Sequence, residues 1–327
     1  MRRASLFLAL IALAAPSAAG AFLISPPIDC DLGETCHIQN YVDRDPGPGA
    51  ADFTCGPLTY DGHKGTDFAL PSLSEMRAGV DVIAAAPGTV LALRDGMPDI
   101  AANDPAAPDL GGRDCGNGVL IDHGGGWQTQ YCHMKRGSIA VTKGQRVTKG
   151  AVLGKVGLSG RTEFPHAHLS VRQDGAILDP FAPAPGPVSC DGRTGGTPLW
   201  EDPLTYRAGG LISVGITTSI PEYDRLKEGL STPEALPVDA PALVVWGYAF
   251  GGQSGDRVIL TLNGPDGQIL NHAATLDRNQ AQFFRAAGKR CCGGPAQWRT
   301  GIYSGAVVLM RAGRELDRRA VDIRIGN

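Results

Sequence analysis

The segment HAHLSV, residues 166–171, alternates polar and apolar side chains. This alternation predicts a half-buried β-strand, because successive side chains of a strand point to opposite faces. His166 and His168 then share the polar face of that strand. The segment therefore presents a pair of imidazoles on one side of a predicted sheet.

The segment HKGTDFAL, residues 63–70, carries a second pair of polar side chains. Gly65 argues against a helix here, so we expect an extended chain. Residues an even number apart in an extended chain share a face, which places His63 and Asp67 on the same side. If the two segments form neighbouring strands, His168 points at the same spot.

This residue set predicts a metal site. Two imidazoles and one carboxylate, from His63, Asp67 and His168, leave a fourth tetrahedral position for water, the pattern of catalytic rather than structural zinc. We expect one Zn2+ per chain, with bonds of ~2.0–2.2 Å.

Three segments together resemble the lysostaphin-type zinc endopeptidases of bacterial cell walls. They are HKGTDFAL, the strand and turn GVLIDHGGGWQTQYCHM at residues 118–134, and HAHLSV. Each motif alone is common by chance, but the three occur in the family's order. The resemblance covers about residues 60–181 and implies an antiparallel β-sheet metallopeptidase domain.

The resemblance also implies a role for each of five residues. It assigns His63, Asp67 and His168 as zinc ligands. His133 and His166 fall on the family's two unligated catalytic histidines, which polarise the water or stabilise the transition state. Non-catalytic relatives usually lack at least one of the five, and this chain has them all.

The activity implied by the resemblance is that of a secreted zinc metalloendopeptidase. It would hydrolyse peptide bonds of peptidoglycan, in cross-links or stem peptides, with a zinc-activated water. Two alternatives stay open: a non-catalytic regulator of cell-wall hydrolases, and a peptidase that acts on exported protein.

Other candidate sites have simpler interpretations. His37, His123 and His272 lie outside the matched positions, and we expect surface or turn histidines there. The glycine-rich segments at residues 111–118 and 122–127 lack the strand and helix context of phosphate-binding loops, so we interpret them as loops.

The N-terminus has the pattern of a secretory signal peptide. Arg2 and Arg3 precede an apolar run at residues 6–15 and small residues at 17–21. No later segment is apolar for the ~18 residues that a membrane span needs. We expect an exported protein, periplasmic or extracellular, without a membrane span.

All eight cysteines lie after this segment, which predicts disulfides in an oxidising compartment. Cys115 and Cys132 flank a predicted hairpin at nearly matched distances from its turn, so we expect them to pair. Cys30 with Cys36 is a plausible second bridge. The sequence leaves the remaining four undecided: Cys55, Cys190, Cys291 and Cys292.

Composition and turn spacing predict a mainly β chain. It has 45 Gly, 24 Pro and few helical patterns, and its formal net charge of −3 argues against nucleic acid as a partner. Residues 95–114 are an expected insertion between two strands. The alternating strands near the C-terminus suggest a small β-sandwich, immunoglobulin-like.

The predicted domain organisation follows from these patterns. It comprises a signal peptide (1–21), an N-terminal extension (22–59), the metallopeptidase domain (60–181), a Pro/Gly linker (182–199) and the β-sandwich (200–327). The linker predicts that the metallopeptidase domain folds on its own. The β-sandwich would be an accessory module or a module that binds a partner protein.

Overall fold

The structure is a computed structural model that describes residues 21–184, 195–291 and 297–326. Nearly all of the predicted signal peptide and the middle of the predicted linker lie outside the described residues. Among the described helices, none has the length and apolar character needed to cross a membrane.

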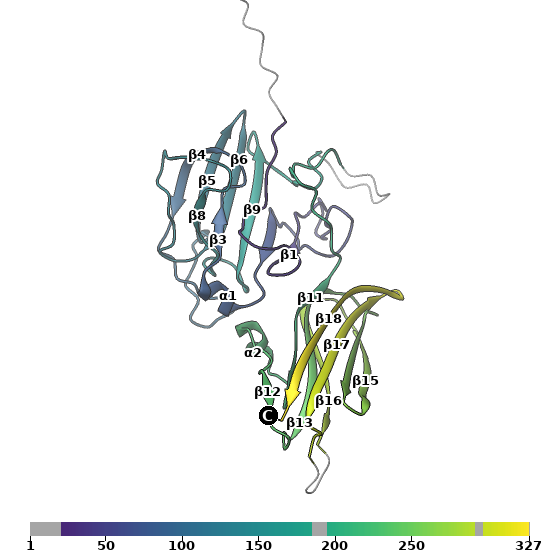
Figure 1. Cartoon of the computed structure of the whole chain (residues 1–327). Helices are drawn as coiled ribbons and strands as arrows, with labels where there is room; N and C mark the ends of the chain where they lie inside the picture. Colours follow the sequence, from purple (N-terminus) through teal and green to yellow (C-terminus); the bar gives the residue numbers. More distant parts are fainter. Residues whose placement is uncertain (1–20, 185–194, 292–296, 327) are drawn as a thin grey trace, which may run out of the picture.

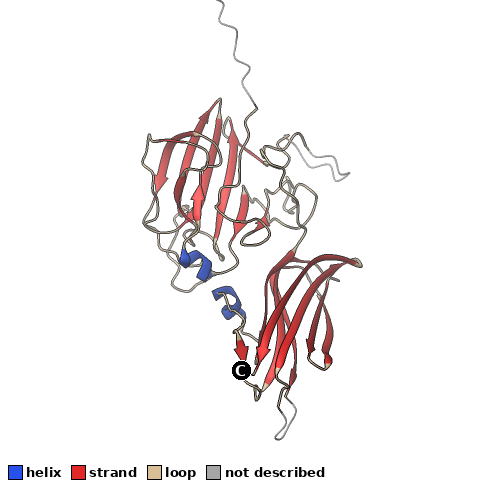
Figure 2. Cartoon of the chain, in the orientation of Figure 1, coloured by secondary structure: helices blue, strands red, loops and turns tan. Residues whose placement is uncertain are grey.

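The chain is mainly β, as predicted, and its strands pair almost entirely in antiparallel fashion (Figure 2). The two described helices have six residues each: α1 (Leu73–Ala78) and α2 (Tyr223–Glu228). Ser72 caps the first, its hydroxyl accepting a hydrogen bond from the backbone N–H of Glu75.

The N-terminal half contains an eight-stranded sheet (Figure 1). Its main path runs β1-β2-β9-β6-β5-β4-β7, with β10 pairing on β9. A two-stranded sheet, β3-β8, accompanies it. The strands are β1 (His37–Asn40), β2 (Thr66–Ala69), β3 (Asp81–Ile83), β4 (Gly88–Arg94), β5 (Asn117–Gly124), β6 (Trp127–Met134), β7 (Arg146–Val147), β8 (Val152–Lys155), β9 (His166–Gln173) and β10 (Ala176–Leu178).

The HAHLSV segment forms the first six residues of β9, near the middle of this sheet. Its apolar members, Ala167, Leu169 and Val171, are at most 1% exposed and belong to the core. The apolar face is therefore buried as predicted, but the strand is not half-buried, because His166 and Ser170 on the polar face are each 3% exposed. Antiparallel pairing of β2 with β9 places Asp67 directly opposite His168.

The C-terminal half contains two further antiparallel sheets (Figure 1). A three-stranded sheet has the order β11-β13-β16, and a five-stranded sheet has the order β12-β18-β17-β14-β15. A separate apolar cluster joins their facing sides. The strands are β11 (Gly210–Thr217), β12 (Ala235–Leu236), β13 (Ala242–Gly252), β14 (Arg257–Gly264), β15 (Gly267–Thr275), β16 (Gln280–Arg290), β17 (Gly301–Arg311) and β18 (Arg314–Ile325). An immunoglobulin-like topology stays a prediction.

The two halves touch through buried side chains. The ring of His37 lies 4.4 Å from that of Phe250, and Gln39 donates to the carbonyl of Ala281. Trp246 belongs to the same apolar cluster as the first sheet. The interpretation of His37 as a surface or turn histidine is wrong, because the residue is 6% exposed in β1. The predicted domain boundaries stay a prediction.

Both expected disulfides are present. Cys115 and Cys132 are bonded with their Cα atoms 4.8 Å apart, and Cys30 and Cys36 with 6.1 Å. Cys55 is also disulfide-bonded. The first bridge links the chain before β5 to the end of β6, immediately before His133.

Candidate active site

The five residues singled out in the sequence meet at one end of the central strands. His63 lies in the loop before β2 and Asp67 within β2, whereas His133 lies near the end of β6. His166 and His168 come from β9. All except His168 are at most 7% exposed.

Three atoms of this group form a tight triangle. His63 Nε2 lies 3.2 Å from Asp67 Oδ1 and 3.2 Å from His168 Nδ1, and the third edge, from His168 Nδ1 to Asp67 Oδ1, is 2.7 Å. The predicted ligand set therefore converges on one point.

Hydrogen bonds on the outer side of both imidazoles set their tautomers. The carbonyl of Tyr41 can only accept, so His63 Nδ1, 2.7 Å away, must carry the proton. Ser170 donates its hydroxyl proton to the carbonyl of Lys64 and therefore accepts from His168 Nε2. His168 thus turns an unprotonated nitrogen toward Asp67. Burial lowers the pKa of His63 but the Asp67 carboxylate raises it more, so without a metal His63 Nε2 holds a proton that it shares with Asp67.

This arrangement fits a cation. Two ring nitrogens and an ionised carboxylate converge, and a positive charge at their centre, a proton or a metal ion, stabilises this arrangement. Tetrahedral zinc with bonds of ~2.0–2.1 Å places its ligands about 3.3 Å apart. The two 3.2 Å distances match this spacing. The 2.7 Å distance between His168 Nδ1 and Asp67 Oδ1 must lengthen slightly when the metal binds.

His133 and His166 are oriented in the same manner beside the triangle. His133 Nδ1 donates to the carbonyl of Ser159 at 2.8 Å, and His166 Nδ1 donates to that of Phe164 at 3.0 Å. Each ring thus turns Nε2 inward. His133 and His166 also form a possible ligand group with His168, but that group lacks a carboxylate.

The backbone of His133 is unusual. Its φ of 60° lies in the left-handed region, which is rare for residues other than glycine. The N–H of His133 donates to the carbonyl of Cys115, and the disulfide to Cys132 holds the same two chain segments together. Such strain persists where the surroundings enforce it, often at functional sites.

The electrostatics of the group are dominated by burial and by the single carboxylate. Burial alone would raise the pKa of Asp67, but the surrounding histidines hold it well below its usual range, so Asp67 is ionised. Burial, reinforced by His166 and His168, holds the pKa of His133 well below its usual value. His133 is therefore a neutral imidazole near pH 7.

Two further residues at the site were missed by the sequence motifs. The side-chain amide of Asn40 donates to Asp67 Oδ2 at 2.9 Å, and this oxygen also lies 3.1 Å from His63 Nε2. The Tyr60 ring lies 4.5 Å from that of His63 and is 54% exposed. Both residues lie in or near the stretch predicted to be an extension outside the domain.

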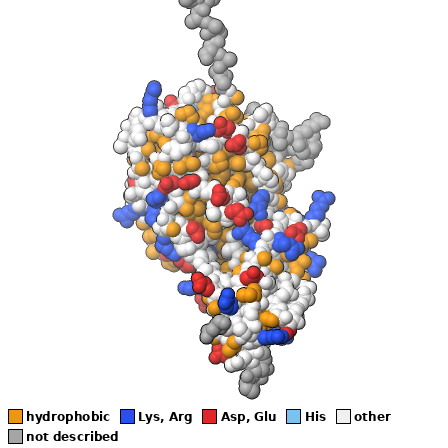
Figure 3. Space-filling model, viewed as in Figure 1, with side chains coloured by type: hydrophobic (Ala, Val, Ile, Leu, Met, Phe, Trp, Pro, Cys, Tyr) orange, Lys and Arg blue, Asp and Glu red, His pale blue; other side chains and the backbone are white. Residues whose placement is uncertain are grey.

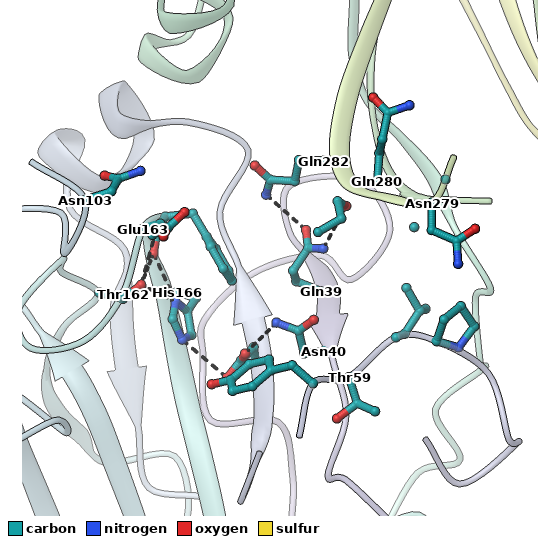
Figure 4. A pocket seen from close by; sticks show the side chains of 18 of the residues that line it. Gln39, Asn40, Thr59, Asn103, Thr162, Glu163, His166, Asn279, Gln280 and Gln282 are labelled. Carbon is teal, nitrogen blue, oxygen red and sulfur yellow. Dashed lines mark hydrogen bonds and ion pairs between the residues drawn. The ribbon is translucent and has the colours of Figure 1, made fainter. Parts of the chain in front are cut away.

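A cleft of about 810 Å3 opens beside these residues (Figure 4). Asp67, His133 and His166 line one part of it, and Asn103 of the inserted segment borders it. The start of β16 lines the other side. On the face drawn in Figure 3, acidic and basic side chains are interspersed, without a patch of one sign.

Comparison with known proteins agrees with this geometry. The profile of peptidase family M23 matches residues 61–180. The peptidoglycan DD-endopeptidase ShyA of Vibrio cholerae is 36% identical over 109 residues, which cover 33% of this chain and 20% of ShyA. The DD-carboxypeptidase/endopeptidase Mpg of Neisseria meningitidis is 31% identical over 122 residues, 37% of this chain and 23% of Mpg.

The chain thus spans about a fifth of the length of these relatives. Among solved structures, a zinc-containing peptidase from Vibrio cholerae is 25% identical, with a TM-score of 0.29 over 43% of this chain and 38% of that one. The residues matched by the family profile include all five of the cluster.

Proposed function

Residues 61–180 form a domain of peptidase family M23, and from this premise we propose that the protein is an exported zinc metalloendopeptidase that hydrolyses peptide bonds of peptidoglycan. The single observation that carries the proposal is the convergence of His63 Nε2, Asp67 Oδ1 and His168 Nδ1 to within 3.2 Å of one another. The peptidoglycan endopeptidases among the relatives support the choice of substrate.

The three converging residues would hold the zinc. When bound, the metal supplies Lewis acidity toward a water and toward the scissile carbonyl. Asn40 steadies the carboxylate of Asp67 through its other oxygen, at 2.9 Å. Ser170 and the carbonyl of Tyr41 fix the two imidazoles from behind, the usual arrangement around metal-ligating histidines.

His133 and His166 would perform the proton chemistry. His133 is neutral and turns Nε2 toward the cleft, so it accepts the proton of the attacking water. His166 Nε2 lies 3.3 Å from Asp67 Oδ1 and also faces the cleft. His166 Nε2 is thereby placed to hydrogen-bond the oxyanion that forms on the carbonyl.

Export is supported by the disulfides. Structural disulfides form in oxidising compartments and are rare in the cytosol. The bridges at Cys115–Cys132 and Cys30–Cys36 therefore agree with the signal-peptide pattern at residues 1–21. We propose a periplasmic or extracellular location.

Digestion of purified sacculi tests the proposal. The protein without residues 1–21 should release fragments whose masses show cleaved peptide bonds and intact glycan bonds. A chelator should stop the release, and added zinc should restore it. Intact sacculi together with binding to a wall hydrolase would favour a non-catalytic regulator of cell-wall hydrolases. Cleavage of exported proteins but not of sacculi would favour a peptidase that acts on exported protein.

A further inference from the structure

The cleft is built from both halves of the chain. Asp67, His133 and His166 line it, as do the turn before β16 and the first residues of that strand. Figure 4 shows His166 and Gln280 on opposite sides. Its volume of about 810 Å3 exceeds what a single peptide bond needs and lies in the usual range for ligand sites. A substrate that fills the cleft therefore touches the C-terminal half.

The contact between the two walls is held by buried hydrogen bonds. Gln39, which is 1% exposed, donates to the carbonyl of Ala281 at 3.1 Å and accepts from the amide of Gln282 at 3.0 Å. The hydroxyl of Tyr248 donates to the other side of Gln282. The far wall is thereby fixed to β1.

The same strand reaches the candidate metal ligand. A register irregularity between Ile38 and Asn40 lies at Gln39, and bulges of this kind redirect side chains near active sites. Gln39 thus contacts β16 while its neighbour Asn40 contacts Asp67. Two consecutive residues connect the far wall to the catalytic centre.

The turn that enters β16 is also held in place. Ser254 donates its backbone N–H to the side chain of Asn279 at 3.0 Å and its hydroxyl to the carbonyl of Asp277 at 3.2 Å. Arg278 lies between these two anchored residues and lines the cleft, as does Gln280. Both side chains therefore project from a fixed backbone.

The charges of the cleft point to its ligand. Arg161 pairs with Asp114, and Lys227 pairs with Asp224. Within the described part of the chain, the guanidinium of Arg278 makes no ion pair or hydrogen bond, and the same is true of the Gln280 carboxamide. The opposing unpaired charge, Glu163, lies on the facing wall (Figure 4).

We propose that the turn at Arg278 and Gln280 is a substrate subsite of the C-terminal half, which binds a carboxylate-bearing peptide segment beyond the scissile bond. Arg278 pairs with the carboxylate, and the carboxamide of Gln280 offers a donor and an acceptor to a backbone amide. The inference rests on the proposed function, because it concerns the substrate of that same centre.

Equilibrium binding of a fluorescent, cross-linked stem-peptide dimer tests the subsite. The full chain is used in a His166→Ala background, and mass spectrometry checks that the probe stays intact. The probe is compared with the same dimer after amidation of its carboxylates. We expect tighter binding of the acidic probe by roughly fivefold to tenfold, the scale of one hydrogen-bonded ion pair that solvent partly screens.

Single substitutions test which side chains produce the preference for the acidic probe. Arg278→Gln should abolish the preference for the acidic probe, and Gln280→Ala should weaken the binding of both probes severalfold. Glu163→Gln removes a negative charge from the same cleft and should keep or strengthen the preference. The exposed substitutions Arg314→Gln and Gln268→Ala, outside the cleft, should leave it unchanged.

Equal binding of both probes, no binding, or an unchanged preference in Arg278→Gln would overturn the subsite. The proposed function is tested separately by cleavage of the dimer by the wild-type chain. Cleavage without the binding preference refutes only the subsite. The expected preference without cleavage supports the subsite and contradicts the proposed activity.

Discussion

Gly65 is packed against the back of a proposed metal ligand. A Cβ atom at this position would lie 2.5 Å from His168 Nε2 and 2.6 Å from the carbonyl of Leu169. Because the backbone of β9 cannot move easily, the imidazole must shift and lose its bond to Ser170. We expect Gly65→Ala to weaken zinc affinity at least tenfold, measured by competition with a chelator.

The matched control for this substitution is Gly47→Ala, in an exposed loop where only the Asp45 side chain is near. It should keep the wild-type zinc affinity. Wild-type affinity in Gly65→Ala would contradict the orientation of His168 derived above.

His37 predicts a pH dependence of stability. Burial, partly offset by a hydrogen bond to Gln39, lowers its pKa to about 4. Between pH 6.5 and 4 the unfolded chain binds a proton that the folded chain does not, so the free energy of unfolding falls as the pH falls through this window. The loss is on the order of 3 kcal/mol.

Replacement by a ring that cannot titrate isolates this effect. His37→Phe keeps a ring beside Phe250 and should show a shallower loss of stability from pH 6.5 to 4 in denaturant titrations. His272→Phe, at an exposed position of β15, should keep the wild-type slope. Identical slopes in all three proteins would refute the assignment to His37.

The sequence alone could predict the five residues of the site because their spacing follows strand periodicity and a known motif order. Asn40 could not be found in this manner. Its bond to Asp67 joins residues 27 positions apart and depends on an irregular strand pairing, which no local pattern encodes. The burial of His37 likewise depends on Phe250, far along the chain.

At the scale of elements, the disulfide that links the chain before β5 to the end of β6 should control His133. Replacing Cys115 and Cys132 together by Ser should lower the free energy of unfolding by roughly 3 kcal/mol, the estimate for a loop of this length. We also expect a fall in kcat, because the left-handed backbone of His133 is then less restrained.

The other bridge provides the comparison. Replacing Cys30 and Cys36 by Ser should cost stability, roughly 2 kcal/mol for the shorter loop, and leave kcat unchanged at a temperature where the protein is folded. Equal effects of the two double variants on kcat would show that the Cys115–Cys132 bridge has no particular role at His133.

Strands were predictable as elements where polar and apolar residues alternate over several positions, as in β6 and β9, or where a long apolar run marks them, as in β13. β1 was not, because four residues carry too little pattern and its pairing with β2 is long-range. Its position decides the architecture of the cleft, since it connects the catalytic sheet with β16.

At the scale of the whole molecule, the contacts between the halves argue against independent folding of residues 22–184. Trp246, Tyr248 and Phe250 belong to the apolar cluster of the first sheet. We expect the truncated chain to melt at a lower temperature than the full chain. The residues of the first half that pack against these three side chains would face water in the truncated chain.

A substitution in the full chain controls for the deletion itself. Phe250→Ala should also lower the melting temperature. It removes a buried aromatic side chain, which typically lowers the free energy of unfolding by ~3–5 kcal/mol. An unchanged melting temperature and normal peptide cleavage in the truncated chain would favour the independent domain that the linker composition predicts.

The central claim is that three residues hold zinc while two histidines act beside it. Zinc content by elemental analysis, with the rate of peptide cleavage on the same samples, tests it most directly. We predict about one zinc in the wild type, much less in His63→Ala and His168→Ala, and about one in His133→Ala and His166→Ala, whose kcat falls at least ~10²-fold. Stoichiometric zinc in His63→Ala or His168→Ala, or near wild-type activity in His133→Ala or His166→Ala, would contradict it.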